Sequence, residues 1–399
     1  MSTAEKAPRG DAGAATLAAA IALGPQIRAA RDEIEHARRL PMPLVEAMKQ
    51  AGIFRMPMPR KWGGPEIDPM MQVRIIEALA VEDASVGWCA MIGSDGGYFS
   101  AFLAESVARE MYRDLDAVTA GAVSVTGRAV RCKGGFRLSG RWPFASGIHH
   151  STWLICGCMV YEGASPALRP AGVPLTRQCF VPTVDAQILD TWHTTGLRGS
   201  GSCDFTLEDY FVPEERSFDF ENLKFSFDTP LYRHPFAFAL NFPGPALGVA
   251  RAAIDALIAA GTRPRRLSTI DGKLVSGELR GEEFVQEAVG RAEATLAAAR
   301  AYSYATLEEM WDAVSAGRSI PGRVQAQIGM MGAQVYAMCT QAVETAYRAR
   351  GGSAVYANNL LDRCLRDALT MNQHALNSTR AYAMAGRALL GLPVERYVF

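Results

Sequence analysis

The chain has 399 residues, of which 49% are hydrophobic and 21% charged, a composition typical of a folded protein with a large core. Lysine plus arginine and aspartate plus glutamate number 41 each, so no net charge recruits nucleic acid or an anionic membrane. Proline, glycine or charge interrupts every apolar stretch before the roughly 18 residues that a membrane span requires. We therefore expect a soluble protein whose partner is a small molecule or another subunit.

The eight cysteines are scattered, without a CxxC pair or the spacing of metal ligands. They predict free thiols in a reducing cytoplasm and no metal site. The N-terminal stretch MSTAEKAPRGDAGAATLAAA opens with mixed charges and lacks the leucine-rich core of a secretory signal. A helix after a frayed tail is expected there.

Three regions differ in hydrophobic pattern. Residues 1–114 carry apolar side chains at helical spacing, as in PLVEAMKQAGIF, between glycine and proline turns. Residues 115–225 change to short alternating runs broken by glycine, such as STWLICGCMVY, which predict strands. Residues 226–399 return to long alanine- and leucine-rich segments. The predicted fold class is α+β, with an N-terminal helical domain, a central antiparallel β domain and a C-terminal four-helix bundle.

The stretch 361–378, LDRCLRDALTMNQHALNS, predicts one helix with two distinct faces. Leucines and alanines form an apolar stripe along it. The opposite stripe is polar and comprises Arg363, Asp367, Thr370, His374 and Ser378. A lone histidine on such a stripe indicates a helix that lines a cavity, with a satisfied core or surface histidine as the alternative.

Four longer motifs then occur in one order: GIFRMPMPRKWGGPEID at 52–68, GGFRLSGRWPFASG at 134–147, TTGLRGSGSCDFTLEDYFVPEE at 194–215 and RARGGSAVYANNLLDRCLRDAL at 348–369. In these motifs the chain resembles the acyl-CoA dehydrogenase superfamily over nearly its full length. The resemblance implies that superfamily's three-part fold, with a flavin bound between the β domain and the helical bundle.

The resemblance also implies which β-domain residues meet the flavin. Ser146 occupies the position that contacts the flavin near its reactive edge, where a hydroxyl tunes the electronics of the ring. An ST-turn serine at a strand end is the alternative. Trp142 and Trp192 are candidates to wall the ring or the substrate, with a core position as the alternative for each.

Three further positions match the superfamily's cofactor contacts. Arg263 matches an arginine that reaches the flavin phosphate, often across a subunit boundary. Its alternative is a solvated charge cluster in TRPRR. Gly351 and Gly352 match a glycine pair that permits close backbone approach.

One departure from the superfamily pattern concerns the catalytic base. Members that dehydrogenate acyl thioesters commonly carry YEGT after an RDA-like segment, and its glutamate abstracts the α proton. Here RDAL is followed by TMNQHALNS, so His374 stands near that place. The other known base location lies near Ala246, and no carboxylate follows there before Asp255. Together with WCAMIGSDGGYF and GLRGSGS, the pattern resembles the two-component, flavin-dependent monooxygenase branch.

That branch implies an oxygenase component that takes reduced flavin, FMNH2 or FADH2, from a separate reductase. With molecular oxygen it would hydroxylate a small aromatic or heteroaromatic substrate through a flavin C4a-hydroperoxide. His374 and Ser146 are the expected catalytic residues, since an imidazole with an ordinary pKa of about 6.5 can give or take a proton. The alternatives are an acyl-CoA dehydrogenase with tightly bound FAD and a flavin-binding scaffold without catalysis.

The C-terminal segments also bear on assembly. IGMMGAQVYAMCTQAV and ALNSTRAYAMAGRALLGL are apolar on more than one face. Apolar faces of this kind need burial against other helices or another subunit. We therefore expect a homotetramer built by packing of the C-terminal bundles.

Overall fold

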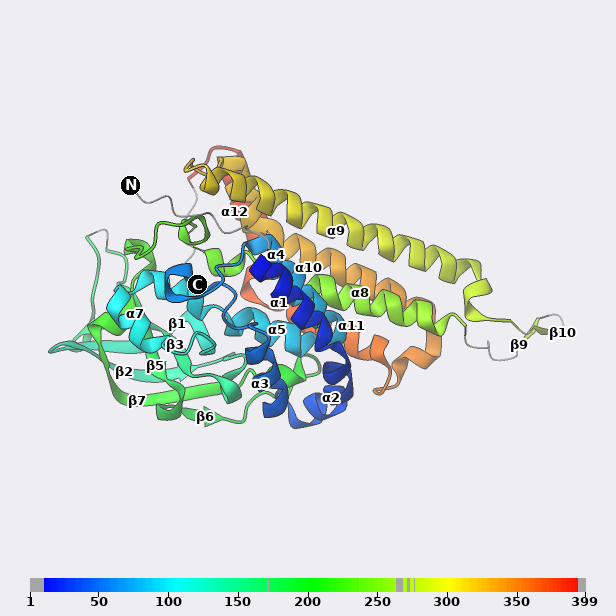
Figure 1. Ribbon diagram of the computed structural model, residues 1–399, viewed down its shortest axis with the longest axis horizontal. Coiled ribbons are helices and arrows are strands. Elements are labelled where there is room, and N and C mark those ends of the chain that lie inside the picture. Colours follow the sequence, from blue (N-terminus) through cyan, green and yellow to red (C-terminus); the bar gives the residue numbers. More distant parts are fainter. Residues whose placement is uncertain are drawn as a thin grey trace.

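The computed structural model describes residues 11–170, 172–234, 236–262, 268–270, 273–275 and 277–393. A twisted sheet forms one end of the molecule, and the long helices of the C-terminal part extend away from it (Figure 1). The helix Ala84–Gly93 of the N-terminal part lies between the sheet and the long helices. The fold is of the predicted α+β class.

The N-terminal part is helical, as predicted, and its helices are α1 (Asp11–Ala22), α2 (Gly24–Ala37), α3 (Met42–Gln50), α4 (Pro69–Glu82), α5 (Ala84–Gly93), α6 (Gly96–Phe99) and α7 (Glu105–Met111). Asp83 separates α4 from α5 because its backbone is extended. Its carboxylate accepts hydrogen bonds from Ser85 N and Val86 N, which caps the start of α5. Helix α5 is buried on nearly all sides, so its side chains are held in fixed positions.

The sheet consists of β1 (Thr119–Cys132), β2 (Gly135–Trp142), β3 (Trp153–Glu162), β4 (Ser165–Pro166), β5 (Thr176–Pro182), β6 (Gln187–Leu189), β7 (Asp204–Pro213) and β8 (Ser217–Phe218). The strand order is β6-β7-β2-β1-β3-β5-β8, and β4 pairs with β3. The alternating runs seen in the sequence therefore form strands.

One pair departs from the predicted antiparallel arrangement, because β1 and β3 are parallel. The chain forms a hairpin from β1 to β2 and then crosses to the opposite edge of β1 before β3 begins. Strand β3 therefore runs in the opposite direction to β2 and in the same direction as β1. The crossover, residues 143–152, carries Ser146.

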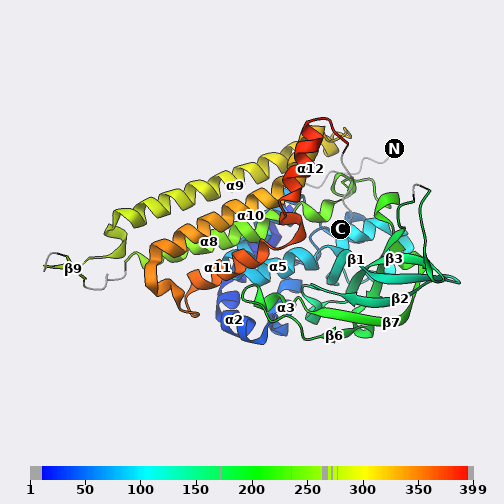
Figure 2. The ribbon, with the colours of Figure 1, turned by 180° about the vertical axis from the view of Figure 1, so that it is seen from behind.

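The C-terminal helices are α8 (Pro243–Ala260), α9 (Glu283–Ser315), α10 (Gly322–Arg350), α11 (Leu360–Met371) and α12 (Arg380–Leu389), with a β9 (Ser268–Ile270) and β10 (Lys273–Val275) hairpin between α8 and α9. The segment Ala237–Ala260 is long and apolar enough to cross a membrane, but most of it is buried inside the protein. Helix α8 packs against α4, α10 and α11. Seen from behind, α11 lies beside α8 and α5 (Figure 2).

The predicted helix over 361–378 is shorter than expected. Helix α11 ends at Met371, and a 3-10 turn follows at Ala375–Asn377. Met371 O, at the end of the helix, accepts from His374 N at 3.1 Å and from the side-chain amide of Asn377 at 2.9 Å. His374 therefore projects from a turn after α11, and the predicted polar stripe does not continue to Ser378.

Candidate functional site

Four segments far apart in the sequence meet where the sheet faces the helices. Helix α5 supplies Trp88, the crossover supplies Ser146, and the loop before β7 supplies Ser202. The turn after α11 supplies His374, whose ring lies 5.6 Å from the Trp88 ring, centroid to centroid. The indole Nε1 of Trp88 donates to Ser146 Oγ at 2.9 Å. The structure thus brings together the two predicted catalytic residues through one tryptophan.

Three serine hydroxyls form a buried chain. Ser146 Oγ lies 2.8 Å from Ser202 Oγ, and Ser202 Oγ lies 2.7 Å from Ser200 Oγ. Ser200 Oγ donates to Leu197 O at 2.7 Å. Ser146 is therefore part of a hydrogen-bonded chain, not of a local ST turn. Ser200 and Ser202 lie in the GLRGSGS motif, but sequence reasoning singled out neither.

Leu197 joins this chain to the helices. Its backbone has a left-handed φ of 49°, which is uncommon for leucine. Its N–H donates to Asp367 Oδ1 on α11 at 2.6 Å. Its carbonyl oxygen accepts from Trp192 Nε1 at 2.9 Å as well as from Ser200. Trp192 is half-buried, and its hydrogen bond to Leu197 O supports the same turn.

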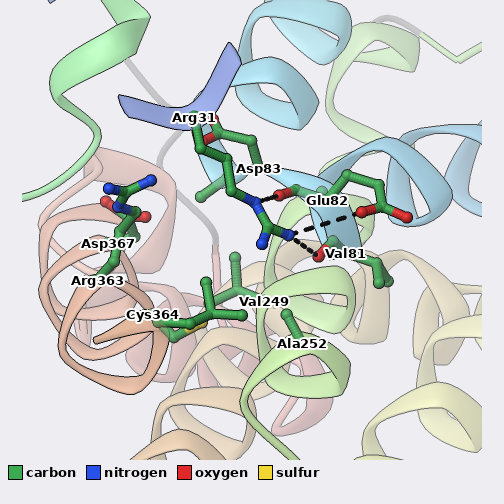
Figure 3. A pocket seen from close by; sticks show the side chains of 12 residues that line it. Arg31, Val81, Glu82, Asp83, Val249, Ala252, Arg363, Cys364 and Asp367 are labelled. Carbon is green, nitrogen blue, oxygen red and sulfur yellow. Dashed lines mark hydrogen bonds and ion pairs between the residues drawn. The ribbon is translucent and has the colours of Figure 1, made fainter. Parts of the chain in front are cut away.

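Asp367 is buried on the side of α11 that faces a small pocket (Figure 3). Burial first, and then the nearby charge of Asp83, raise the pKa of its carboxyl to about 7. The Leu197 N–H and Arg366 act in the opposite direction. Across the pocket, Arg31 pairs with Glu82. Asp367 was predicted on the polar stripe, and it is instead an internal group that holds the Leu197 turn.

His374 is half-buried, and burial lowers its pKa to about 4. The imidazole is therefore neutral near pH 7. Its Nδ1 accepts a hydrogen bond from Leu376 N at 3.3 Å, so the hydrogen of the neutral ring is assigned to Nε2. The ring also packs 4.8 Å from Phe242. His374 thus presents an N–H donor within an aromatic wall.

Phe242 and Tyr336 extend that wall. The Phe242 ring lies 5.8 Å from Trp88 and 5.1 Å from Tyr336, and the Tyr336 hydroxyl donates to Phe242 O at 2.9 Å. The aromatic groups around His374 therefore come from α5, α10 and the start of α8. Such an arrangement suits a flat apolar ligand, since stacked and edge-on contacts between rings are favourable.

The two predicted tryptophans have different positions. Trp142 is fully buried, donates to Gly157 O at 2.9 Å and stacks on Phe205 at 5.2 Å. It is a core residue of the sheet, which favours the core position given as its alternative. The chain offers Phe144 instead, two residues before Ser146. Its side chain is 66% exposed, and its ring lies edge-on to Trp192 at 6.3 Å.

Phe144 also has a left-handed backbone, with φ of 64°. A large aromatic side chain in this conformation strains the backbone, and its exposed ring leaves apolar area in contact with water. Both effects are unfavourable. An exposed ring beside Ser146 and Trp192 fits a site that receives a planar aromatic cofactor. Sequence reasoning missed Phe144, although the GRWPFASG motif contains it.

The predicted glycine pair, Gly351 and Gly352, does not join this site within one chain. A Cβ at Gly332 of α10 would lie 3.1 Å from Asn377 Oδ1, which places Gly332 beside the His374 turn. Gly351 follows 19 residues later, roughly 28 Å along a helix. Gly351 and Gly352 are exposed. Arg263 lies outside the described residues.

Comparisons with known proteins identify the family of the chain. Residues 18–120 match the model for the acyl-CoA dehydrogenase N-terminal domain, and residues 240–379 match that for the acyl-CoA dehydrogenase C-terminal domain. Indole-3-acetate monooxygenase of Pseudomonas putida is 30% identical over 94% of this chain and 95% of its own length. The flavin-dependent monooxygenase oxygenase subunit HsaA of Rhodococcus jostii is 25% identical over 94% of this chain and 97% of its length.

The structure of XiaF from Streptomyces, solved in complex with FADH2 and glycerol, matches with a TM-score of 0.86 and 25% identity. The match covers 97% of this chain and 98% of that one. These relatives are oxygenases and not acyl-CoA dehydrogenases, in keeping with a histidine where a carboxylate base was looked for. The chain belongs to the acyl-CoA dehydrogenase family, and within it to the flavin-dependent monooxygenases.

Proposed function

We propose that this monooxygenase hydroxylates a small, mainly apolar aromatic or heteroaromatic compound of the indole or phenol class. The observation that carries the proposal is the convergence of Trp88, Phe242 and His374, whose rings lie 4.8 to 5.8 Å apart. These rings offer edges and faces to a flat substrate beside one N–H donor. The relative named indole-3-acetate monooxygenase supports a substrate whose ring system is about the size of indole.

The residues of the chain have distinct roles in the proposal. Bound flavin supplies the activation of molecular oxygen. Phe144 and Trp192 contact the flavin ring, and Ser146 makes a hydrogen bond at its edge. His374, neutral near pH 7, holds a hydrogen on Nε2 and can hydrogen-bond to the oxygen being transferred or return a proton to it. The aromatic wall keeps water away from the reacting atoms.

The dehydrogenase alternative is less well supported by the position of the carboxylates. Asp367 is the acid on α11 nearest in sequence to His374. Its carboxyl already accepts a hydrogen bond from Leu197 N, in the turn that holds Ser200 and Ser202. The turn that carries His374, residues 372–378, contains no acid. No carboxylate from α11 or this turn is thus available to abstract a proton from an acyl thioester.

We further propose that flavin arrives from a separate reductase and leaves in each cycle. The relative named oxygenase subunit supports a two-component system. Protein purified without added flavin should then be largely colourless, because a shuttled cofactor is not retained. All eight cysteines are free, which supports a cytoplasmic location.

Assembly is proposed to be a homotetramer through the C-terminal helices. Large apolar side chains are exposed on these helices and at their ends, at Ile258, Phe284, Leu369, Leu389 and Leu390. Neighbouring subunits would cover them and would bring the Gly351–Gly352 turn of one chain to the flavin of another. Light scattering at micromolar concentration should report four chains, and a monomer would contradict this.

The function is tested with a generic flavin reductase, NADH, FMN or FAD, and a panel of indoles and phenols under 18O2. We expect a product that carries one labelled oxygen atom. Bleaching of bound FAD by an acyl thioester without oxygen, and no labelled product, would favour the dehydrogenase. No turnover with either would favour a flavin-binding scaffold.

A further inference from the structure

The serine chain consists of Ser146, Ser202 and Ser200, and it ends at Leu197 O. Each contact along it can hold one hydroxyl hydrogen. Ser200 must donate to Leu197 O, because a carbonyl cannot donate. Ser202 must then donate to Ser200, and Ser146 to Ser202, if each contact is to hold a hydrogen. Trp88 Nε1–H donates to Ser146 Oγ. This assignment uses every hydroxyl hydrogen and leaves Ser146 one free lone pair.

The chain therefore makes Ser146 a hydrogen-bond acceptor toward a ligand. Nitrogen N5, at the reactive edge of a flavin, carries a hydrogen in the reduced ring and only a lone pair in the oxidised ring. We infer that the serine chain selects reduced over oxidised flavin, and that Ser200 sets this preference by fixing the direction of the chain. The inference rests on the proposed contact between Ser146 and the flavin edge.

Binding of the oxidised ring through Ser146 requires the chain to reverse. Ser146 would donate to the ligand, Ser202 to Ser146, and Ser200 to Ser202. Leu197 O would then lose the Ser200 hydroxyl but keep Trp192 Nε1 at 2.9 Å and Ser200 N at 3.0 Å. The reversal loses one hydrogen bond, so the preference it produces is roughly two- to tenfold in affinity.

Leu197 O, the acceptor at the end of the serine chain, is held in place. This fixes the direction in which the serine hydroxyls donate. Leu197 is buried, and its N–H is bound by Asp367 Oδ1 at 2.6 Å. Arg366 on the same helix also donates to Thr195 O two residues earlier. A Cβ on Gly196 would meet Arg366 O at 2.1 Å, so the turn lies tightly against α11. The Leu197 carbonyl is thus a fixed acceptor.

The variant Ser200→Ala tests the inference by removing the hydroxyl that sets the direction. Ser202 then loses its acceptor and donates to Ser146, so Ser146 becomes the donor. We expect the ratio of the oxidised to the reduced dissociation constant, measured with FMN and with FAD, to fall roughly two- to tenfold. Reduced flavin is measured without oxygen. The two-electron midpoint potential of bound flavin should fall by about 30 mV for a tenfold change.

Ser151→Ala is a matched control. Ser151 Oγ donates to Ile148 O at 3.0 Å and lies 2.8 Å from Thr183 Oγ1, so it repeats the contacts of Ser200 outside the chain. We expect this variant to keep the parental ratio. An unchanged ratio in Ser200→Ala, in protein that melts no lower than the control, overturns the inference.

Ser146→Ala separates failure of the inference from failure of the site. We expect Ser146→Ala to lower the ratio of the oxidised to the reduced dissociation constant by the same factor as Ser200→Ala. If Ser146→Ala shifts the ratio and Ser200→Ala does not, the direction of the chain has no role and only this inference fails. If Ser146→Ala changes neither affinity, Ser146 does not meet the flavin, and the proposed cofactor contact fails with it.

Discussion

Asp367 Oδ1 accepts a 2.6 Å hydrogen bond from the backbone N–H of Leu197, and this bond ties α11 to the turn that holds Ser200 and Ser202. The C-terminal half of α11 thus serves the site twice, because His374 follows three residues after the helix ends at Met371. Asp367 holds the serine turn, and His374 joins the aromatic residues supplied by other helices.

Loss of the Asp367 carboxylate should loosen the serine turn. We expect Asp367→Ala to lower the free energy of unfolding by about 1–3 kcal/mol, because it leaves the Leu197 N–H unpaired. Hydrogen–deuterium exchange at residues 197–202 should rise, and less product should form per NADH. Asp367→Asn keeps an acceptor oxygen and should match the parent in hydrogen–deuterium exchange at residues 197–202 and in product formed per NADH.

Asp116→Ala is the control for loss of a buried carboxylate, since Asp116 pairs with Arg55 and not with this turn. It should lower stability without change in exchange at residues 197–202. Equal exchange in the Asp367→Ala and parent proteins would mean that the bond does not hold the turn.

Asp367 should also give a distinct pH dependence of stability. The pKa of its carboxyl rises from 3.8 to about 7 on folding. Between these values the folded form binds the extra proton, so this group's contribution to the free energy of unfolding falls as pH rises from about 4 to 7. Glu35 and Asp83 favour the raised pKa, and Arg366 opposes it.

Asp367→Asn cannot titrate, so its stability relative to the parent should increase across that window. Urea unfolding of both proteins at several pH values measures the difference. The contribution of the buried histidines to the pH dependence is the same in both proteins and cancels in this difference. Among them are His150 and His234, whose pKa values burial lowers to about 4. A difference that is flat from pH 4 to 7 would show that the Asp367 carboxyl is not titrating in the fold.

The two aromatic residues of the GRWPFASG motif should respond differently to truncation. Trp142→Ala removes a fully buried ring stacked on Phe205 and should cost about 3–5 kcal/mol of stability. Phe144→Ala removes an exposed ring and should change stability little, while flavin affinity falls several-fold. Thermal melts and flavin titration of both variants measure this. Unchanged flavin affinity in Phe144→Ala would exclude that ring as a cofactor contact.

Much of the fold was predictable because hydrophobic period and length distinguish helices from strands. The parallel β1–β3 pair was not predictable, because strand direction depends on which edge the crossover reaches. At the end of α11, the carbonyl of Met371 accepts from His374 N and from the side chain of Asn377, contacts that residue spacing does not reveal. A stretch such as TMNQHALNS fits either a helix or a turn by spacing alone.

The site was predicted less completely than the fold. His374 and Ser146 followed from the resemblance, and the structure joins them through Trp88. Trp142 was singled out and Phe144 was missed, because the sequence does not show that β2 ends at Trp142 or that Phe144 has a left-handed backbone. Ser200 and Ser202 acquire their role only through contacts made across the turn.

The role of His374 is the central claim, and it is tested by product formed per NADH oxidised in His374→Ala, with a melting curve. Ser378→Ala is the control, because Ser378 is exposed in the same segment and should keep parental activity. We expect His374→Ala to fold and bind flavin like the parent while substrate oxygenation falls roughly a hundredfold or more and hydrogen peroxide persists or rises. Parental product per NADH in a His374→Ala protein that melts lower would contradict the account, because His374 would then serve packing alone.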